Sequence, residues 1–231
     1  MNLPDHYSEL APFAEAFDRG TPALLYHRLG WAPPFAQRRG LTLPPGVFRR
    51  QLRELRAAGF STEQERLWLT FDDGDATALG ALEPLRESGF RAVMFLVAGR
   101  IGGVNDWDGT GAPLMDEAQV RDWLAAGQGI GSHTLTHARL PGLDPVRARE
   151  EIGASRRALE DRFGVAVELF AYPWGAMDER MKDLVAEAGY RLAFTTEGGV
   201  NDAATPRLAL RRYTAWCALR RPRELWLALT S

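Results

Sequence analysis

The sequence predicts an α/β fold: a single domain that forms a distorted TIM-like barrel of about seven βα units, a (β/α)7 barrel. Short apolar runs of strand length alternate with amphipathic helical stretches along the chain, which is typical of parallel strands joined by helices. No glycine-rich nucleotide-binding turn links a strand to a helix, so an open dinucleotide-binding sheet is disfavoured. The length of 231 residues fits one core and is short for two.

The first half of the chain contains three apolar runs bounded by turn residues, each of strand length. The stretches between these runs have helical spacing, and Phe48, Leu52 and Leu55 fall on one face of the first helix. We expect strands at residues 24–29, 67–71 and 92–97, and helices at residues 47–58 and 76–87. A loop of about fifteen residues follows, and because it exceeds the usual connection length we interpret it as a functional lid.

The second half of the chain continues the alternation of helix and strand. We expect helices at residues 116–126, 145–163 and 178–188, strands through residue 130 and at residues 167–172, 192–195 and 208–213, and a terminal helix at residues 223–229. Active sites of parallel α/β barrels lie at the carboxyl ends of the strands. Polar residues that follow these strands are therefore the first candidates for a functional site.

The composition excludes several classes of protein. The 28 basic residues are balanced by 30 acidic ones, giving a formal charge of −2, so a nucleic-acid partner is not expected. No stretch approaches the length of about 18 apolar residues that a membrane span needs, and the amino terminus lacks the pattern of a secretory signal. The single Cys217 cannot form an internal disulfide. We expect a cytoplasmic protein with no membrane span.

Two adjacent carboxylates stand where one expected strand ends. Asp72 and Asp73 precede Gly74, and at such a turn both side chains can point into the mouth of a barrel. A turn without any chemical role is the alternative, because Asp and Gly are common turn residues.

Two histidines four residues apart follow another expected strand. A tight turn would bring His133 and His137 to one ion, and one carboxylate would complete the three protein ligands typical of a catalytic zinc site. A strand cap and an exposed surface histidine are the alternative. Because His27 also ends an expected strand, three strand ends would converge, which favours a site.

These residues resemble the polysaccharide deacetylases with a NodB-homology domain. The segment TFDDG, which contains Asp72, looks like the first motif of that family, and SHTLTH, which contains His133, is similar to the second. The resemblance implies that Asp72 is the catalytic base and that Asp73, His133 and His137 bind a divalent metal, most simply Zn²⁺, with Co²⁺, Ni²⁺ or Mn²⁺ as alternatives. The family's proline after the glycine is Asp75 here.

The segment AYPW resembles the third motif of the family. The resemblance implies that Trp174 lines the substrate groove and that its backbone N–H helps to form the oxyanion hole, with Tyr172 and Pro173 as further substrate-binding residues. Many members carry an arginine that orients the base at the position of Ala171. Another residue of this chain must therefore orient Asp72.

No histidine follows His137, so the family's C-terminal Leu-x-x-His motif, the usual source of the general acid, is missing. The early segment LLYH and the segment GYRLAFT look like the poly-N-acetylglucosamine deacetylase branch, where the motif order is circularly permuted and an early histidine is the acid. The resemblance therefore implies His27 as the acid. It covers a core of about residues 22–215 within one NodB-homology domain, residues 1–231.

The resemblance implies a hydrolase that removes N-acetyl groups from an amino sugar or an N-acetylated glycan. Trp107 in the lid loop is a substrate-binding candidate because an indole can stack on a sugar ring, with packing on the barrel rim as the alternative. Two other functions stay open. One is an amidohydrolase for a non-sugar C–N bond, such as that of a cyclic imide or ureide; the other is a catalytically impaired carbohydrate-binding homologue.

Overall fold

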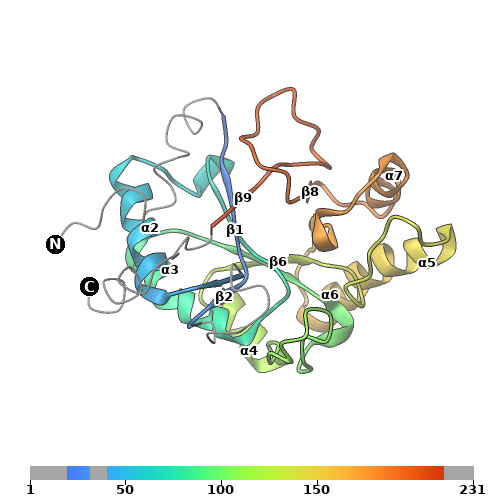
Figure 1. The fold of residues 1–231 in the computed structure, drawn as a ribbon, viewed down its shortest axis with the longest axis horizontal. Coiled ribbons are helices and arrows are strands. Elements are labelled where there is room, and N and C mark those ends of the chain that lie inside the picture. The colour runs from blue at the N-terminus through green and yellow to red at the C-terminus, as the bar shows by residue number, and fades with distance from the viewer. Residues whose placement is uncertain (1–19, 32–40, 216–231) are drawn as a thin grey trace.

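The structure is a computed structural model that describes residues 20–31 and 41–215. Its central element is one sheet of 7 strands in the order β8-β7-β6-β5-β4-β1-β9, and all neighbouring strands are parallel. The sheet curls into a half-barrel with helices outside it (Figure 1). The predicted fold class, a distorted (β/α)7 barrel in a single domain, is confirmed.

The strands of this sheet are short and largely buried. Their bounds are β1 Ala23–Tyr26, β4 Trp68–Phe71, β5 Val93–Leu96, β6 Gly129–Ser132, β7 Leu169–Ala171, β8 Leu192–Phe194 and β9 Tyr213–Thr214. Apolar side chains on both faces are the usual pattern for a parallel sheet packed between helices and a filled interior. A second, 2-stranded sheet pairs β2 (Arg28–Leu29) with β3 (Thr42–Leu43) just beyond the end of β1.

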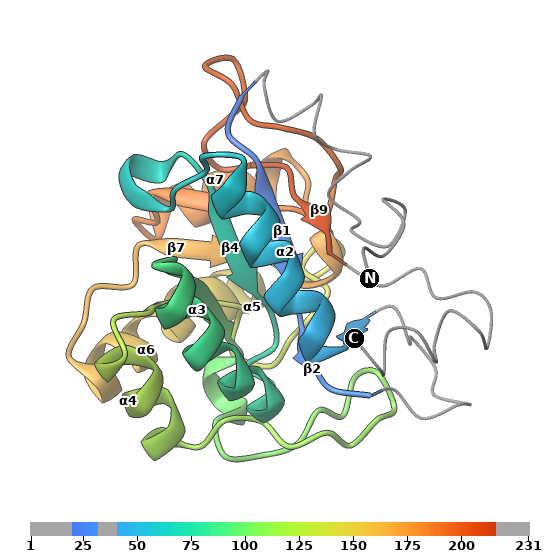
Figure 2. The ribbon, with the colours of Figure 1, turned by 90° about the vertical axis from the view of Figure 1, so that its left-hand side faces the viewer.

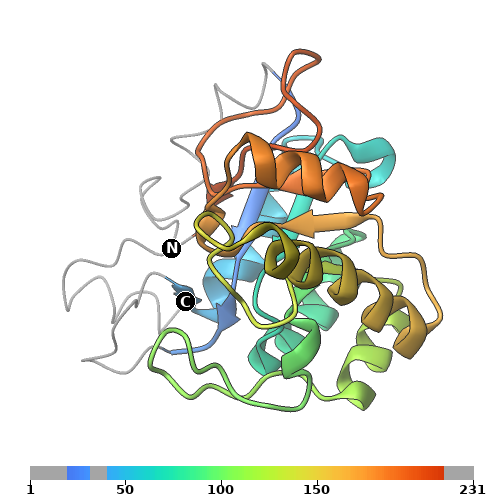
Figure 3. The same cartoon turned by 90° about the vertical axis from the view of Figure 1, so that its right-hand side faces the viewer.

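In the part of the chain that the structure describes, six α-helices cover the outside of the half-barrel. They are α2 Pro45–Ala57, α3 Leu82–Ser88, α4 Glu117–Ala125, α5 Pro145–Arg149, α6 Ser155–Phe163 and α7 Glu179–Glu187. Helices α2 and α3 lie side by side on one flank (Figure 2), and α5 to α7 cover the opposite flank (Figure 3). No helix within residues 20–31 and 41–215 is long and apolar enough to cross a bilayer.

The expected helix at residues 76–87 is wrong in type over its first half, whereas the expected helix at residues 145–163 forms one helical run that contains a π turn. Residues 76–87 form a 3₁₀ helix, η5 (Ala76–Ala81), followed by α3. Pro84 explains the break, since it has no N–H to donate to the preceding turn and is tolerated only near the start of a new helix. Residues 145–163 contain a π-helical turn, η7 (Glu150–Ala154), between α5 and α6. Such a single π turn often occurs at a functional site.

The expected strand at residues 208–213 is also wrong in extent. Only β9 is a strand there, and Leu210 forms an isolated parallel bridge with Phe194. The segment before β9 still hydrogen-bonds along the free edge of β8: Leu210 N donates to Ala193 O at 2.8 Å, and Thr195 N donates to Leu210 O at 2.8 Å. One short segment therefore links the β8 edge of the sheet to the β1 edge. The expected terminal helix at residues 223–229 lies outside the described residues.

Candidate active site

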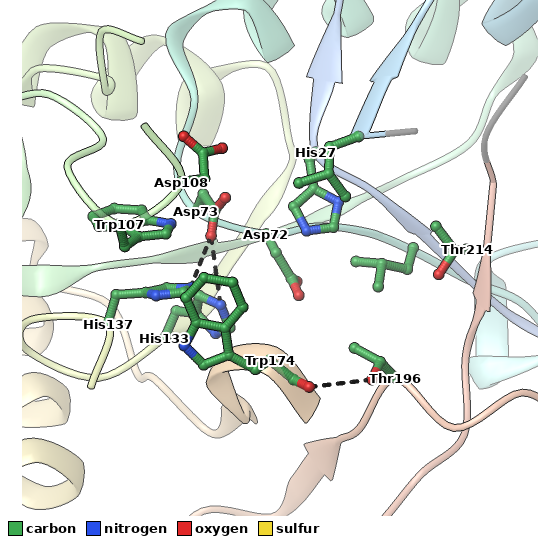
Figure 4. A pocket seen from close by; sticks show the side chains of 12 residues that line it. His27, Asp72, Asp73, Trp107, Asp108, His133, His137, Trp174, Thr196 and Thr214 are labelled. Atoms are coloured by element: carbon green, nitrogen blue, oxygen red, sulfur yellow. Dashed lines mark hydrogen bonds and ion pairs between the residues drawn. The ribbon is translucent and has the colours of Figure 1, made fainter. Parts of the chain in front are cut away.

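The carboxyl ends of three strands on the same edge of the sheet open into one cavity of about 200 Å³. β1 leads to His27, β4 leads to Asp72 and Asp73, and β6 leads to His133, with His137 on the turn that follows (Figure 4). All five side chains line the cavity. The structure thus brings together the residues that the sequence indicates for the metal, the base and the acid.

The proposed metal ligands lie at the spacing that a small divalent ion requires. Asp73 Oδ1 is 3.3 Å from His137 Nε2 and 3.6 Å from His133 Nε2. The three ligand atoms lie within 4.8 Å of one another, and all three residues are buried. Ligands held about 2.0–2.1 Å from a tetrahedral ion stand about 3.4 Å apart. The residues present therefore fit such an ion.

The protonation states of these residues also suit a metal. His133 Nδ1 donates to Ala171 O at 2.8 Å, which leaves the Nε2 lone pair facing Asp73. Burial lowers the pKa of His133 to about 4, so its imidazole is neutral at pH 7. Burial alone would raise the pKa of Asp73, but its hydrogen bond with His137 and the nearby histidines hold that pKa below its usual range. A neutral imidazole and an ionised carboxylate are the forms that bind metal.

The backbone at this site takes conformations that are unusual for residues other than glycine. The φ angles are 74° at Asp73, 68° at Thr134, 63° at His137 and 63° at Trp174. Each left-handed residue of this kind costs on the order of 1–3 kcal/mol, and such residues cluster at functional sites. Among the described residues, only Gln64 and Glu65 join these four as non-glycine positions with positive φ. The strained backbone is thus concentrated where the side chains converge.

A buried carboxylate fixes the turn between the two histidines. Glu151, on the π-helical turn η7, accepts hydrogen bonds from the backbone N–H groups of Leu135 and Thr136, each at 3.0 Å. The Thr136 hydroxyl donates to Glu151 at 2.7 Å, and Arg147 pairs with the same carboxylate at 2.8 Å. Sequence reasoning missed Glu151, because one extra residue in a helical turn leaves no recognisable mark on the hydrophobic period.

Asp72 forms a bidentate ion pair with Arg212, and both side chains are buried. Arg212 Nη1 and Nη2 donate to the two carboxylate oxygens of Asp72 at 2.7 and 2.8 Å. Burial alone would raise the pKa of Asp72, but the Arg212 guanidinium and the nearby His133 and His27 together outweigh burial, so the pKa lies below its usual value. Asp72 is therefore ionised at neutral pH, as a general base must be.

The guanidinium of Arg212 is itself firmly held. Its Nε donates to Thr195 O at 2.8 Å and its Nη1 donates to Thr70 Oγ1 at 3.1 Å. It lies 5.7 Å from the ring centroids of both Phe95 and Phe194, within the range of cation–π attraction. Arg212 thus provides, from the segment before β9, the orientation of Asp72 for which the sequence offered no residue.

A sequence signal for Arg212 did exist, although our interpretation of the sequence did not use it. Leu208, Leu210 and Arg212 occupy every second position, which is the alternation of an extended segment with one inward face, and the structure buries Leu210 and Arg212. An arginine in register with apolar residues on an inward face is unusual, because arginine is rarely buried without a partner. That pattern indicates an internal ion pair, but it does not reveal the partner.

His27 lies in the cavity with its imidazole beside Asp72 (Figure 4). Burial has the largest effect and lowers the pKa of His27 below its ordinary value, while the charges of Asp73 and Asp72 act in the opposite direction. The net lowering leaves this imidazole largely neutral at pH 7 in the metal-free protein. A histidine with a lowered pKa is a stronger acid when it does carry the proton.

Two tryptophans form aromatic walls around His137. The ring of Trp107 is parallel to the imidazole, with centroids 4.3 Å apart and 12° between the planes. Trp174 meets the same imidazole edge-on at 4.9 Å and 76°. Both tryptophans line the cavity, whereas Tyr172 and Pro173 are buried and do not. The role of all four residues in substrate binding stays a prediction.

Comparison with known proteins gives the same family at the level of sequence. The model of the family described as "Polysaccharide deacetylase" matches residues 60–193, more than half of the 231 residues. The protein YxkH of Bacillus subtilis, named for the same family, is 24% identical over 208 residues, which are 83% of this chain and 70% of YxkH.

Solved structures show the same fold. IcaB from Ammonifex degensii superposes with a TM-score of 0.72 at 23% identity, over 91% of this chain and 96% of that one. The polysaccharide deacetylase BA0330 from Bacillus anthracis gives a TM-score of 0.73 at 22% identity, over 85% of this chain. The chain spans 65% of BA0330. At these identities the likeness is one of fold.

Proposed function

The chain belongs to the polysaccharide deacetylase family, and we propose that it is a metal-dependent hydrolase that removes N-acetyl groups from an amino sugar or an N-acetylated glycan. One observation carries the proposal: a buried Asp73–His133–His137 cluster shares its cavity with Asp72, a carboxylate kept ionised by Arg212. Zn²⁺ is the proposed ion because its preferred ligands are the imidazole and carboxylate groups found here.

The proposed mechanism divides the work between the two aspartates. A divalent ion held by Asp73 and the two histidines would supply a Lewis acid that polarises the acyl carbonyl and acidifies a coordinated water. Asp72 takes the proton of the attacking water, and Arg212 keeps that carboxylate charged and aimed. Since Arg212 donates to both oxygens, the carboxylate cannot turn away from the cavity without breaking two charge-assisted hydrogen bonds.

His27 is the proposed acid for the leaving nitrogen. Its imidazole faces the same cavity as Asp72, so both groups can reach one bound acyl group. The amine that leaves must gain a proton, and among the described lining residues His27 is the histidine outside the proposed metal ligands. The family resemblance adds the backbone N–H of Trp174 as a donor to the oxyanion.

The walls of the cavity favour a sugar substrate. Trp107 and Trp174 offer indole surfaces of the kind that stack on pyranose rings. The acetamido group of such a sugar would enter the cavity between these indoles. We further propose that the catalytic domain has its core at about residues 22–215 and that the protein acts in the cytoplasm.

The experiment that tests this function combines metal analysis with acetate release. The purified protein should contain about one equivalent of a divalent ion and should release acetate from N-acetylated mono- or oligosaccharides, with loss of activity on chelation and recovery on adding Zn²⁺, Co²⁺, Ni²⁺ or Mn²⁺. Metal binding without acetate release from any such sugar contradicts the proposal. Turnover of a cyclic imide or ureide instead would identify the non-sugar amidohydrolase, and metal without any turnover the impaired homologue.

A further inference from the structure

Three buried charged residues beside the cavity have no part in the mechanism above: Arg28, Asp75 and Asp108. Each is a close neighbour in the chain of a residue with a proposed role, namely His27, Asp73 or Trp107. The three belong to different segments: β2, the turn after β4, and the lid loop between β5 and α4.

One guanidinium joins these three segments. Arg28 Nε lies 3.2 Å from Asp75 Oδ2, and Arg28 Nη2 donates a hydrogen bond to Asp108 Oδ2. All three residues are less than a tenth exposed, so solvent does not screen the charges. Breaking a buried pair of this kind is far more costly than breaking a surface pair.

Both carboxylates are also fixed from their own segment. The second oxygen of Asp75 accepts from the backbone N–H and the hydroxyl of Thr77, at 2.9 and 2.6 Å. The second oxygen of Asp108 accepts from the same two groups of Thr110, at 3.0 and 2.6 Å. Each carboxylate therefore has one oxygen on its own turn and one directed to Arg28, which transmits the position of one segment to the next.

The lid loop is rigid where it carries Trp107. The buried Asn105 accepts hydrogen bonds from the backbone N–H groups of Trp107 at 3.3 Å and Asp108 at 3.2 Å. The backbone N–H of Asn105 donates to Ala112 O at 2.8 Å, which closes the loop. Trp107 and Asp108 are thus anchored to the same side chain, so the ion pair of Asp108 also bears on the place of the indole.

Within the described part of the chain, the imidazole of His137 lacks a restraint that the imidazole of His133 has. The Nδ1 of His133 is fixed by Ala171 O, whereas the Nδ1 of His137 is buried with no hydrogen-bond partner among residues 20–31 and 41–215. Metal-binding histidines usually have their second ring nitrogen fixed by such a partner, which sets the plane of the ring. The parallel face of Trp107 restrains the ring of His137 instead, together with the edge-on contact of Trp174.

We infer that Arg28 is a positioning residue that acts through Asp108: it fixes the lid loop so that Trp107 stacks on His137 and holds this ligand in the plane that a metal requires. The inference rests on the proposed function for its catalytic meaning. Supports of this kind typically account for about 10–100-fold in metal affinity or activity.

The test uses the two carboxylates that flank Trp107. Asp108→Asn removes the buried charge but keeps the shape, and Arg28 retains its pair with Asp75, so no lone buried charge is left. Asp106→Asn is the matched control, since Asp106 pairs at 2.9 Å with Arg100 and both are about half exposed. The readout is the NMR signals of the imidazole protons in metal-free protein, where a stacked indole shifts those of His137 upfield.

The spectra are simple because the chain has 4 histidines. Trp107→Leu identifies the His137 signals and gives their unstacked position. We expect Asp108→Asn to move the His137 signals toward that position and to weaken Zn²⁺ binding about tenfold or more, with Asp106→Asn within about twofold of wild type. Wild-type His137 shifts and wild-type metal affinity in Asp108→Asn would overturn the inference.

A second variant keeps the test decisive if Asp108→Asn does not fold. Thr110→Val removes the hydroxyl that supports Asp108 and leaves both charges in place, so a smaller displacement of the His137 signals in the same direction is expected. Unchanged signals in folded Thr110→Val would then refute the inference. Because the spectra need neither metal nor substrate, a protein without deacetylase activity would contradict the proposed function and leave this result standing.

Discussion

The two sides of the cavity are constructed in different ways. The proposed metal-binding side comes from two tight turns, after β4 and β6, whose unusual backbone aims Asp73 and His137. The proposed proton-transfer side depends on His27 and Arg212, which enter from β1 and from the segment that links β8 to β9. Metal binding should therefore depend mainly on local structure, while proton transfer should depend on how the edges of the half-barrel meet. Substitutions should therefore be able to abolish metal binding or proton transfer one at a time.

The largest effect is expected on the metal-binding side. His133→Ala removes one of three proposed ligands, so bound metal should be lost and acetate release should fall to background. Elemental analysis of the purified variant and an activity assay with added Zn²⁺ measure both. Retention of a stoichiometric ion with normal affinity would show that His133 is no ligand.

Asp72→Asn should give the opposite combination. The proposed base is lost but the ligands are untouched, so the metal content should stay near one equivalent while kcat falls about 10²–10⁴-fold. Metal titration and steady-state kinetics separate the two properties. A fully active Asp72→Asn protein would rule out Asp72 as the base.

His27→Gln should have a smaller effect, about 10²-fold in kcat, because water can protonate the leaving amine in place of the imidazole. An acid works in its protonated form, so wild-type activity should fall as the pH rises through the pKa of His27. Since burial lowers this pKa, the fall should be centred below about 6.5. The pH profile of His27→Gln should lack this fall in activity. A profile like that of the wild type would assign the acid to another group.

Arg212→Lys is expected to have the smallest catalytic effect, about tenfold in kcat/KM. Lysine keeps the charge but cannot make the bidentate contact with Asp72. Because Arg212 holds the pKa of Asp72 down, its replacement should raise that pKa and shift the rising, acidic limb of the pH profile to higher pH. An unshifted limb would mean that Arg212 does not tune the base.

Arg212→Met extends this test to the stability of the fold. Leaving the Asp72 carboxylate buried without its partner should reduce the free energy of unfolding by about 3–5 kcal/mol at pH 7. The pKa of Asp72 is lowered in the folded state, so its stabilisation exists above the unfolded pKa of about 3.9 and is lost as the pH falls. Denaturant titrations should therefore show that the difference in the free energy of unfolding between wild type and Arg212→Met narrows below about pH 4.

The success of sequence reasoning follows the same division. Hydrophobic periodicity predicted the fold class, and the motifs around Asp73 and His133 pointed to the residues that line the cavity, because both signals are local. Arg212 and its partner Asp72 lie 140 residues apart, and Arg28 and Asp108 lie 80 apart. Such pairs depend on how the sheet curls and which segments meet, and no pattern along one sequence fixes that.

The left-handed backbone at Asp73, His137 and Trp174 has a consequence for engineering. Grafting this site onto another barrel by copying side chains at the right spacing would place them on ordinary backbone, where their directions would differ. The host would have to supply the turns as well, and it would need spare stability of on the order of 1–3 kcal/mol for each turn. In this protein, the unit that can be transplanted is the shaped turn, and the ligand is one part of it.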